Sequence, residues 1–532
     1  MGESMNNGHI SWMKRLVLVA TVTLTACSGD GSDTTSPTTD PSAAASSTVA
    51  ETQAPAYAPA PLAFGGVGEA VLEGPITGGL GVPVIGTGAF DSSGFEYGET
   101  EYFISGTANS YTSAEPLSED GQWNVEVNDS AEYRTRIVVR QPLDPASFNG
   151  TVMVEWLNVT AGLDVPPVWS FSKVEIMRSG AIWVGVSAQR VGIEGGGNPL
   201  GAIRVLKNAD PERYASLNHP GDNYSYDMFS QVGATVWRNA DVLFEGATPE
   251  RMIAAGESQS AFRLTTYLNS ISKTQDVFHG YLVHSRGSRA AQLSSDPGPD
   301  VPGPQIARIR TDLTRPVLTL SAETDVVGQA LGYRRAAQPD TDVFRSWEIA
   351  GTAHADAYSL GIGDTDDGSG RGGAELFAAM LNPPSSVYFG LLTCDLPINA
   401  GPHTYVVRSA IAALDQWVRT GTPPKSMPPL ENTADIEGFV LDEQGLAVGG
   451  IRTPHVDVPV AVLSGLGQAG GSFCGLFGTT KPFSAEQLSA LYVDKAAFLA
   501  EWAQATESAV ASGAILPADK AEVLASAERY PG

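Results

Sequence analysis

The feature that most constrains the fold is the hexapeptide Gly256-Glu257-Ser258-Gln259-Ser260-Ala261, which follows the apolar run 251–255. A serine with small residues two positions before and after it, between a strand and a helix, is typical of a nucleophile elbow. The sharp turn projects the serine hydroxyl above the edge of a sheet, and the N–H of the next residue, Gln259, faces the oxyanion of an attacked acyl group. The usual pattern ends in glycine, so Ser260 departs from it. The hexapeptide predicts a strand, a sharp turn at Ser258 and a helix.

Three more apolar runs follow the hexapeptide, each with the length of a buried parallel strand; they span residues 280–283, 316–320 and 344–350. Asp325 lies in the loop after the second run, and His354 lies in the loop after the third. The order serine, acid, histidine in loops after successive strands is that of the α/β-hydrolase triad. A serine hydroxyl needs an adjacent base, and this base needs a carboxylate that fixes its tautomer. We therefore predict a catalytic triad of Ser258, Asp325 and His354.

Two alternatives concern residues near the ends of these strands. Glu323 lies two residues before Asp325, so it is an alternative triad acid. His284 ends the first run after the elbow, which makes it a candidate for lining the pocket. We expect the remaining downstream and upstream histidines in the core, in loops or on the surface; they are His219, His279, His403 and His455.

The region before the elbow carries further strand and helix patterns. Runs rich in β-branched residues, bounded by Gly, Pro or Asn, predict three strands; they are 135–140, 151–157 and 181–186. A helix over 229–243 is predicted by apolar residues at 3.6-residue spacing, and a second helix follows the elbow. Alternating strands and helices predict an α/β fold, with a mostly parallel central sheet and helices on both faces.

Loops at the carboxyl edge of this sheet supply the other predicted site residues. The loop 158–162 follows a core strand, so we expect its Val159 or Thr160 N–H as the second oxyanion donor. Predicted substrate contacts are Arg286, Asn158 and Gln189. On so acidic a chain, Arg286 suits a substrate carboxylate or polar carbonyl. The alternative is that Arg286 pairs with a neighbouring Asp or Glu.

The chain resembles a family of bacterial exported serine hydrolases, the alpha/beta-hydrolase domain family, over roughly residues 60 to 530. The stretches that carry the resemblance are 154–159, 185–189, 219–222, 226–227, 256–261, 284–286, 350–354, 397–399 and 417–421. The elbow of that family typically ends in Ser-Ala, as Ser260-Ala261 does here. The resemblance implies an α/β-hydrolase fold and a serine nucleophile, and it implies little about the substrate.

The composition divides the chain into four segments. We expect a lipoprotein signal peptide over 1–26, a Ser/Thr/Pro/Ala tether over 27–61, the hydrolase core over 62–360, and a cap with a C-terminal helical buttress over 361–532. The last segment shows no obvious second sheet. It contains a periodic helix from His403 to Thr420, stopped by Gly421. A capping box at Ser484 and Gln487 starts another helix.

The N-terminus has the pattern of a targeting segment. Lys14-Arg15 precedes a short apolar run, and Leu24-Thr25-Ala26-Cys27 resembles a lipoprotein lipobox, with a lipid on Cys27. The alternative is an ordinary signal peptide, and translation starts at Met1, Met5 or Met13. We therefore expect an exported protein anchored by lipid to the bacterial cell envelope.

The remaining cysteines and acidic residues bear on metals and disulfides. Cys394 and Cys474 form an even pair in an oxidising compartment, which predicts one disulfide. No Cys-x-x-Cys or His-x-x-x-His grouping is present, so no zinc site is expected. Asp364, Asp366 and Asp367 lack the final glutamate of a calcium loop, so we expect a solvated turn and no metal.

The formal net charge of −27 disfavours nucleic acid as a partner. The sequence has no P-loop, and no Gly-x-Gly-x-x-Gly stands between a strand and a helix, so we expect no cofactor. The leading hypothesis is hydrolysis of a small-molecule carboxylic ester through an acyl-enzyme, without an obligate protein partner. The alternatives are an acyltransferase or peptidase that uses the same triad, and a catalytically silent lipoprotein that binds a ligand in a hydrolase cleft.

Overall fold

The computed structural model describes residues 57–532, apart from 88, 89, 91, 93, 296, 329, 330, 388, 389, 391 and 472. Residues 56–532 form one compact unit. The predicted signal peptide, Cys27 and all but the last residues of the predicted tether lie outside the described residues. Among the residues that are described, no helix has the length and apolarity needed to cross a membrane.

A nine-stranded sheet forms the centre of this unit, in the order β1-β2-β3-β5-β4-β6-β7-β8-β9. Strands β1, β2, β3 and β5 pair antiparallel, and β5, β4, β6, β7, β8 and β9 pair parallel. The strands are β1 Ala70–Glu73, β2 Tyr97–Thr112, β3 Glu126–Pro142, β4 Thr151–Trp156, β5 Ile182–Val186, β6 Arg251–Glu257, β7 Gly280–His284, β8 Val317–Ala322 and β9 Phe344–Ile349. This mostly parallel sheet confirms the predicted α/β fold.

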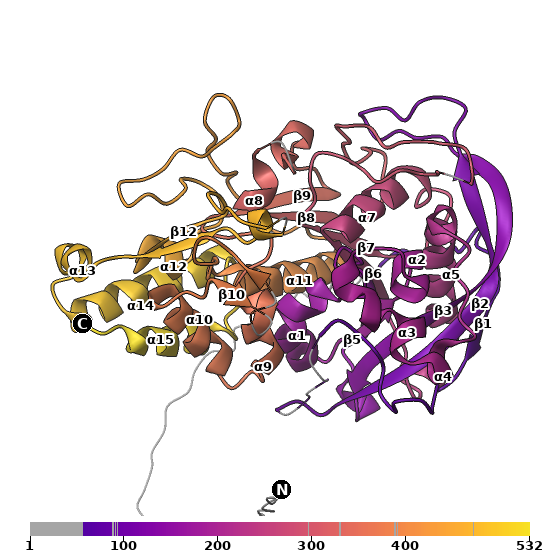
Figure 1. Cartoon of the computed structure of the whole chain (residues 1–532), viewed down its shortest axis with the longest axis horizontal. Coiled ribbons are helices and arrows are strands. Elements are labelled where there is room, and N and C mark those ends of the chain that lie inside the picture. The colour runs from indigo at the N-terminus through magenta and orange to yellow at the C-terminus, as the bar shows by residue number, and fades with distance from the viewer. Residues whose placement is uncertain are drawn as a thin grey trace, which may run out of the picture. The chain divides into compact units, whose positions relative to one another are not determined.

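Helices cover both faces of the sheet, as Figure 1 shows. Alternate residues of β6 divide between two cores: Ile253 and Ala255 pack with α1 and α11, whereas Met252 and Ala254 pack with α5 and α7. Both faces of each parallel strand are buried, which is why these strands read as continuous apolar runs. The helices are α1 Pro167–Ser179, α2 Arg190–Glu194, α3 Leu206–Ala209, α4 Pro211–Tyr214, α5 Ser225–Arg238, α6 Ala240–Leu243, α7 Gln259–Ser270, α8 Glu323–Val326, α9 Gly363–Thr365, α10 Arg371–Leu381, α11 His403–Thr420, α12 Pro454–Asp457, α13 Ala485–Leu491, α14 Lys495–Ser512 and α15 Lys520–Ser526.

The structure corrects two details of the region before the elbow. The predicted helix over 229–243 is two helices, α5 and α6, because Asn239 leaves helical geometry and its side chain donates to the Thr235 carbonyl. The predicted strand 135–140 is the second half of β3, which pairs along its length with β2. Sequence analysis missed β2, the long strand near the right-hand edge of Figure 1.

The C-terminal segment contains small sheets as well as helices, contrary to prediction. β10 (Ser386–Val387) pairs with β11 (Leu392–Thr393), and β12 (Ala461–Ser464) pairs with β13 (Thr479–Pro482). The predicted helix 403–420 is confirmed as α11, which ends at a left-handed Gly421. α11 packs against α1 and against strands β7 and β8, so it belongs to a helical layer that covers one face of the central sheet. The capping box of Ser484 and Gln487 is also confirmed, at the start of α13.

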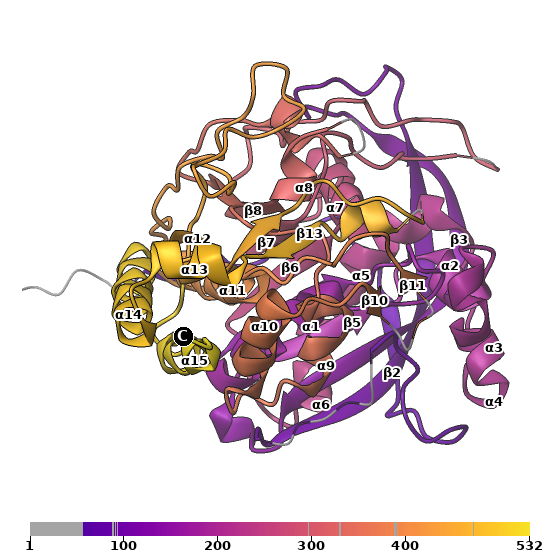
Figure 2. The same ribbon diagram turned by 60° about the vertical axis from the view of Figure 1, so that its left-hand side comes forward.

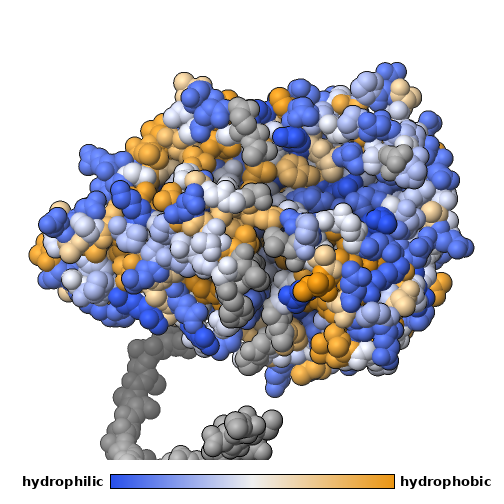
Figure 3. All heavy atoms as spheres, in the orientation of Figure 1, coloured by the Kyte–Doolittle hydropathy of each residue, from blue (hydrophilic) through white to orange (hydrophobic). Residues whose placement is uncertain are grey.

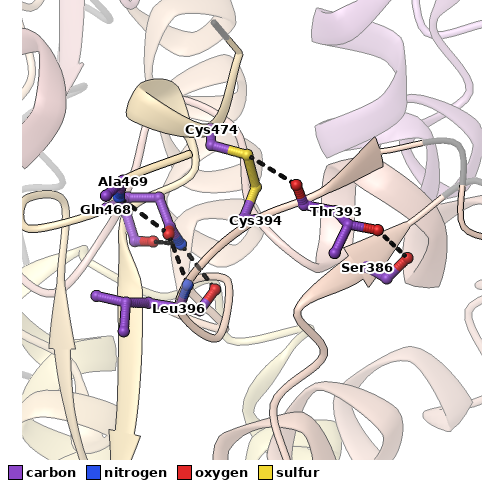
Figure 4. Close-up of a disulfide and its surroundings, with 8 residues drawn as sticks. Ser386, Thr393, Cys394, Leu396, Gln468, Ala469 and Cys474 are labelled. Carbon is purple, nitrogen blue, oxygen red and sulfur yellow. Dashed lines mark hydrogen bonds between the residues drawn. A yellow bond between two sulfur atoms is a disulfide. The ribbon is translucent and has the colours of Figure 1, made fainter. Parts of the chain in front are cut away.

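A disulfide joins Cys394 to Cys474 within this segment, as predicted, with Cα atoms 5.6 Å apart. Figure 4 shows that Gln468 supports the same crossing, because its amide accepts from Leu396 N–H and donates to the Leu396 carbonyl. The disulfide and these hydrogen bonds thereby join residues 394–396 to residues 468–474, two segments that are distant in sequence. Figure 2 shows α14 and α15 adjacent to one another at the far end of the C-terminal segment.

The aspartate cluster 364–367 is only partly the solvated turn that we predicted. Asp364 is exposed, but the side chain of Asp366 is fully buried and lies 2.7 Å from the Arg408 guanidinium of α11. A buried carboxylate is tolerated where an opposite charge and hydrogen bonds compensate it. The face drawn in Figure 3 is a mixture of hydrophilic surface and apolar patches.

Candidate active site

Ser258 lies at a sharp turn between β6 and α7. Its backbone has φ 56° and ψ −122°, a conformation that non-glycine residues rarely adopt. The turn brings α7 so close to β6 that a Cβ on Gly256 would lie 3.0 Å from the backbone of Ser260. A small residue is therefore required at 256. The Ser258 side chain is partly exposed, so a substrate can reach it.

A chain of short hydrogen bonds runs from Ser258 to Asp325. Ser258 Oγ lies 2.7 Å from His354 Nε2, and His354 Nδ1 lies 2.6 Å from Asp325 Oδ1. The second oxygen of Asp325 accepts from Ala322 N–H at 2.7 Å, which fixes the carboxylate. Because the carboxylate accepts from Nδ1, the neutral imidazole carries its proton there and presents a bare Nε2 to the serine hydroxyl.

Glu323, the alternative acid, faces away from this chain of bonds. It accepts from Gly351 N–H at 2.6 Å and from Gly465 N–H at 2.8 Å. Burial raises the pKa of Glu323 to about 7, partly opposed by these hydrogen bonds. Of the two acids, only Asp325 contacts the imidazole.

The loop that carries His354 is held by the C-terminal segment. Ala355 N–H donates to Leu476 O at 3.1 Å, and the Asn399 amide donates to Gly351 O at 3.1 Å. Leu476 lies two residues after the disulfide-bonded Cys474. The C-terminal segment therefore fixes the position of His354 relative to Ser258.

Two backbone amides are candidates for oxyanion donors because neither N–H is bonded within the described residues. Gln259 is the first residue of α7, so its N–H has no partner within the helix. In the 158–162 loop, Thr160 N–H is taken by Asn158 Oδ1 at 2.8 Å, whereas Val159 N–H bonds to no group in the described part of the chain. Gln259 and Val159 are thus the available donors, and their role as oxyanion donors stays a prediction.

The three residues predicted to contact substrate are each engaged within the protein. The Asn158 amide donates to Glu257 O at 3.2 Å, and Gln189 bridges the Trp156 indole and Asp222. Arg286 is only 1% exposed, and its guanidinium donates to the carbonyls of Gly287 and Ala307.

Arg286 makes no ion pair with any described residue, and burial lowers its pKa to about 10. The alternative of a pair with a neighbouring acid is therefore not what the structure shows. Its hydrogen bonds to Gly287 and Ala307 hold the loop after β7 in place. Binding of a substrate anion by Arg286 remains a prediction.

A pair of buried histidines contacts the loop that carries His354. His284 Nε2 and His403 Nε2 are 2.9 Å apart, and His403 Nδ1 lies 3.0 Å from the carbonyl of Ala353, the residue before His354. His403 must donate to that carbonyl, so its Nε2 accepts from His284. Burial lowers the pKa of both, to about 4 for His403. His284 is fully buried, so the candidate role of lining the pocket is wrong.

One neighbour of His354 was missed by sequence analysis. Glu257, directly before Ser258, places Oε1 3.5 Å from His354 Nε2. The available signal was the position of Glu257 in the elbow hexapeptide. A strand pattern does not show whether the side chain of the last strand residue faces a loop from elsewhere in the chain.

Comparison with known proteins identifies the family. A family model described as "Alpha/beta hydrolase domain" matches residues 72–525. No curated protein matches the chain. Among solved structures, the esterase Est22 is 14% identical over 44% of this chain and 66% of that chain, with a TM-score of 0.24. A putative dienelactone hydrolase from Klebsiella pneumoniae is 12% identical over 46% of this chain and 85% of that chain, with a TM-score of 0.23.

A third solved structure, XC6422 from Xanthomonas campestris, is titled as an α/β serine hydrolase without lid. It is 11% identical over 42% of this chain and 80% of that chain, with a TM-score of 0.26. The family model covers most of the chain, including every residue of the Ser258–His354–Asp325 arrangement. The chain belongs to the alpha/beta hydrolase domain family.

Proposed function

We propose that this protein is a serine esterase that cleaves a small-molecule carboxylic ester through an acyl-enzyme. The observation that carries the proposal is the continuous path from partly exposed Ser258 through His354 to Asp325. Such a path supplies a nucleophile, a base and a carboxylate that holds the base. Membership of a hydrolase family supports the same conclusion.

The proposed reaction has two halves. In the first, Ser258 Oγ attacks the acyl carbon while its proton passes to His354 Nε2, and the Gln259 and Val159 amides stabilise the oxyanion. Collapse of the tetrahedral intermediate breaks the ester bond, and His354 gives its proton to the departing alcohol. In the second half, water replaces the alcohol: His354 takes its proton, the acid is released and Ser258 Oγ is reprotonated.

We further propose that the mature protein begins at a lipid-modified Cys27 and is tethered to the cell envelope. The lipobox-like 24–27 sequence supports this, together with the Ser/Thr/Pro/Ala-rich stretch that follows. Transfer of the acyl group to another acceptor, or peptide cleavage, would use the same triad.

The test is turnover of p-nitrophenyl acetate by the wild type and by Ser258→Ala. We expect the rate of the variant to fall by about 10⁴ to 10⁶, because the nucleophile is lost. The melting temperature should stay within a degree or so of the wild type, because a partly exposed hydroxyl contributes little to packing. A variant that keeps more than about a tenth of the rate would disprove the assignment of Ser258, and a folded wild type without any turnover would favour a silent binding protein.

A further inference from the structure

Two carboxyl groups approach the imidazole of His354 from different strands. Asp325, after β8, accepts from Nδ1 at 2.6 Å. Glu257, at the end of β6, lies 3.5 Å from Nε2, the nitrogen that also faces Ser258 Oγ at 2.7 Å. The usual triad needs only the first of these carboxyls. The second faces the atom that carries the proton during the reaction.

The position of Glu257 is fixed by the surrounding backbone. It is 4% exposed and continues the pairing of β6 with β7, opposite His284. The Asn158 amide donates to the Glu257 carbonyl at 3.2 Å and reaches its Oε2 at 3.4 Å. One carboxyl oxygen is therefore anchored to the loop after β4, and the other is directed at His354.

We propose that Glu257 is a second carboxyl for the catalytic base: a positioning residue that acts through His354 and sets the pH above which Ser258 is activated. The proposal rests on the esterase function proposed above, and it adds a determinant of the working pH range.

The other ionisable groups around His354 do not supply this effect. His284 from β7 and His403 from α11 are held neutral by burial, which lowers the pKa of both. Glu155 from β4 is engaged by the N–H groups of Val168, Trp169 and the Trp183 indole. Asp325 occupies the acid position that every triad of this kind has. Glu257 is thus the additional group whose charge bears directly on Nε2.

The direction of the effect follows from the charges. Burial alone lowers the pKa of His354, but attraction to Asp325, and then to Glu257, outweighs burial and raises it to about 9. Burial raises the pKa of Glu257 to about 8. The two groups therefore titrate over the same pH range as a coupled pair. Because the base must be unprotonated, activity is present at high pH and is lost as the pH falls through the pKa of His354.

The kinetic test is the pH dependence of kcat/KM for Glu257→Gln, which keeps the side-chain shape and removes the charge. An opposite charge at this distance raises a partner's pKa by about 1 to 3 units. We therefore expect the acidic limb of the variant to move down by at least about one pH unit. An acidic limb that stays in place would overturn the proposal, whatever happens to the maximal rate.

The matched control is Glu323→Gln. Glu323 is also a fully buried carboxyl near the loop of His354, but it bonds to the backbone of Gly351 and Gly465 and not to the imidazole. We expect the control to leave the acidic limb in place, even where it lowers stability. An equal shift in both variants would show that the change comes from loop disturbance, and it would overturn the specific role of Glu257.

A second measurement does not depend on turnover or on the folding of a variant. In wild-type protein labelled with ¹⁵N-histidine, the His354 resonance is followed from pH 5 to pH 10. We expect a titration broader than that of one independent proton and centred above the ordinary value of about 6.5. A curve that fits a single independent proton would contradict the proposal. A broad curve in a protein without esterase turnover would uphold the coupling of Glu257 to His354 while the function proposed above failed.

Discussion

Two buried clusters of this molecule each place carboxylates against a basic side chain, but they differ in exposure to solvent. The first is the triad cluster of Ser258, His354 and Asp325. The second, the Arg408 cluster, surrounds a guanidinium of α11, and its acids are Asp366, Asp519 and Glu522, at 2.7, 3.1 and 3.4 Å from Arg408. In the Arg408 cluster all three carboxylates face a guanidinium that stays charged. The side chains of Arg408, Asp366 and Asp519 are fully buried.

The triad cluster differs in two respects. Its carboxylate faces an imidazole, which can gain or lose a proton where a guanidinium cannot, and its serine is partly exposed. Buried ion pairing alone therefore does not mark a functional site in this fold. The feature on which our proposal rests is a titratable base between a carboxylate and a partly exposed hydroxyl. The Arg408 cluster instead joins α11 to α15 and to the segment before α10, which fixes the C-terminal segment against the sheet layer.

The largest expected effect distinguishes the two carboxylates that follow β8. Asp325→Asn should lower kcat by about 10⁴, because the imidazole then loses the acceptor that fixes its tautomer. Glu323→Gln should retain at least about ten times more activity than Asp325→Asn, because Glu323 bonds only to backbone amides. Kinetics of both variants with p-nitrophenyl acetate measure this, and the reverse ranking would make Glu323 the triad acid.

A smaller effect, on stability and not on chemistry, is expected in the Arg408 cluster. Arg408→Met keeps much of the side-chain volume but leaves buried carboxylates without their cation. We expect the free energy of unfolding to fall by about 3 to 5 kcal/mol. Urea unfolding measures the loss, and kcat of the folded fraction should stay within about twofold of the wild type. Unchanged stability with a large loss of kcat would reverse the distinction between the clusters.

The sequence predicted the parts of the fold and site that depend on local pattern. The parallel strands from β4 to β9 are short apolar runs. Ser258 follows β6, Asp325 lies in the short helix α8 after β8, and His354 lies in the loop after β9, so their order on the chain was informative. α11 was predicted from its periodicity and its terminal Gly421.

The features that sequence analysis left open or missed depend on contacts between distant residues. Glu323 and Asp325 are separated by two positions, and only the turn of α8 shows which one faces His354. Asp366 has its partner 42 residues away, in Arg408, so a local pattern of aspartates and glycines looked like a solvated turn. The direction of Glu257 toward His354 likewise follows from the position of a loop almost a hundred residues later in the chain.

The most direct test of the central claim is labelling of the folded protein with a fluorophosphonate, followed by mass spectrometry of its peptides. The path from Ser258 to Asp325 predicts one adduct, on Ser258, and slow or absent labelling in His354→Ala because the hydroxyl then lacks its base. Labelling of Ser258 at the same rate in His354→Ala, or an adduct on another serine, would contradict the claim that these residues form one catalytic unit.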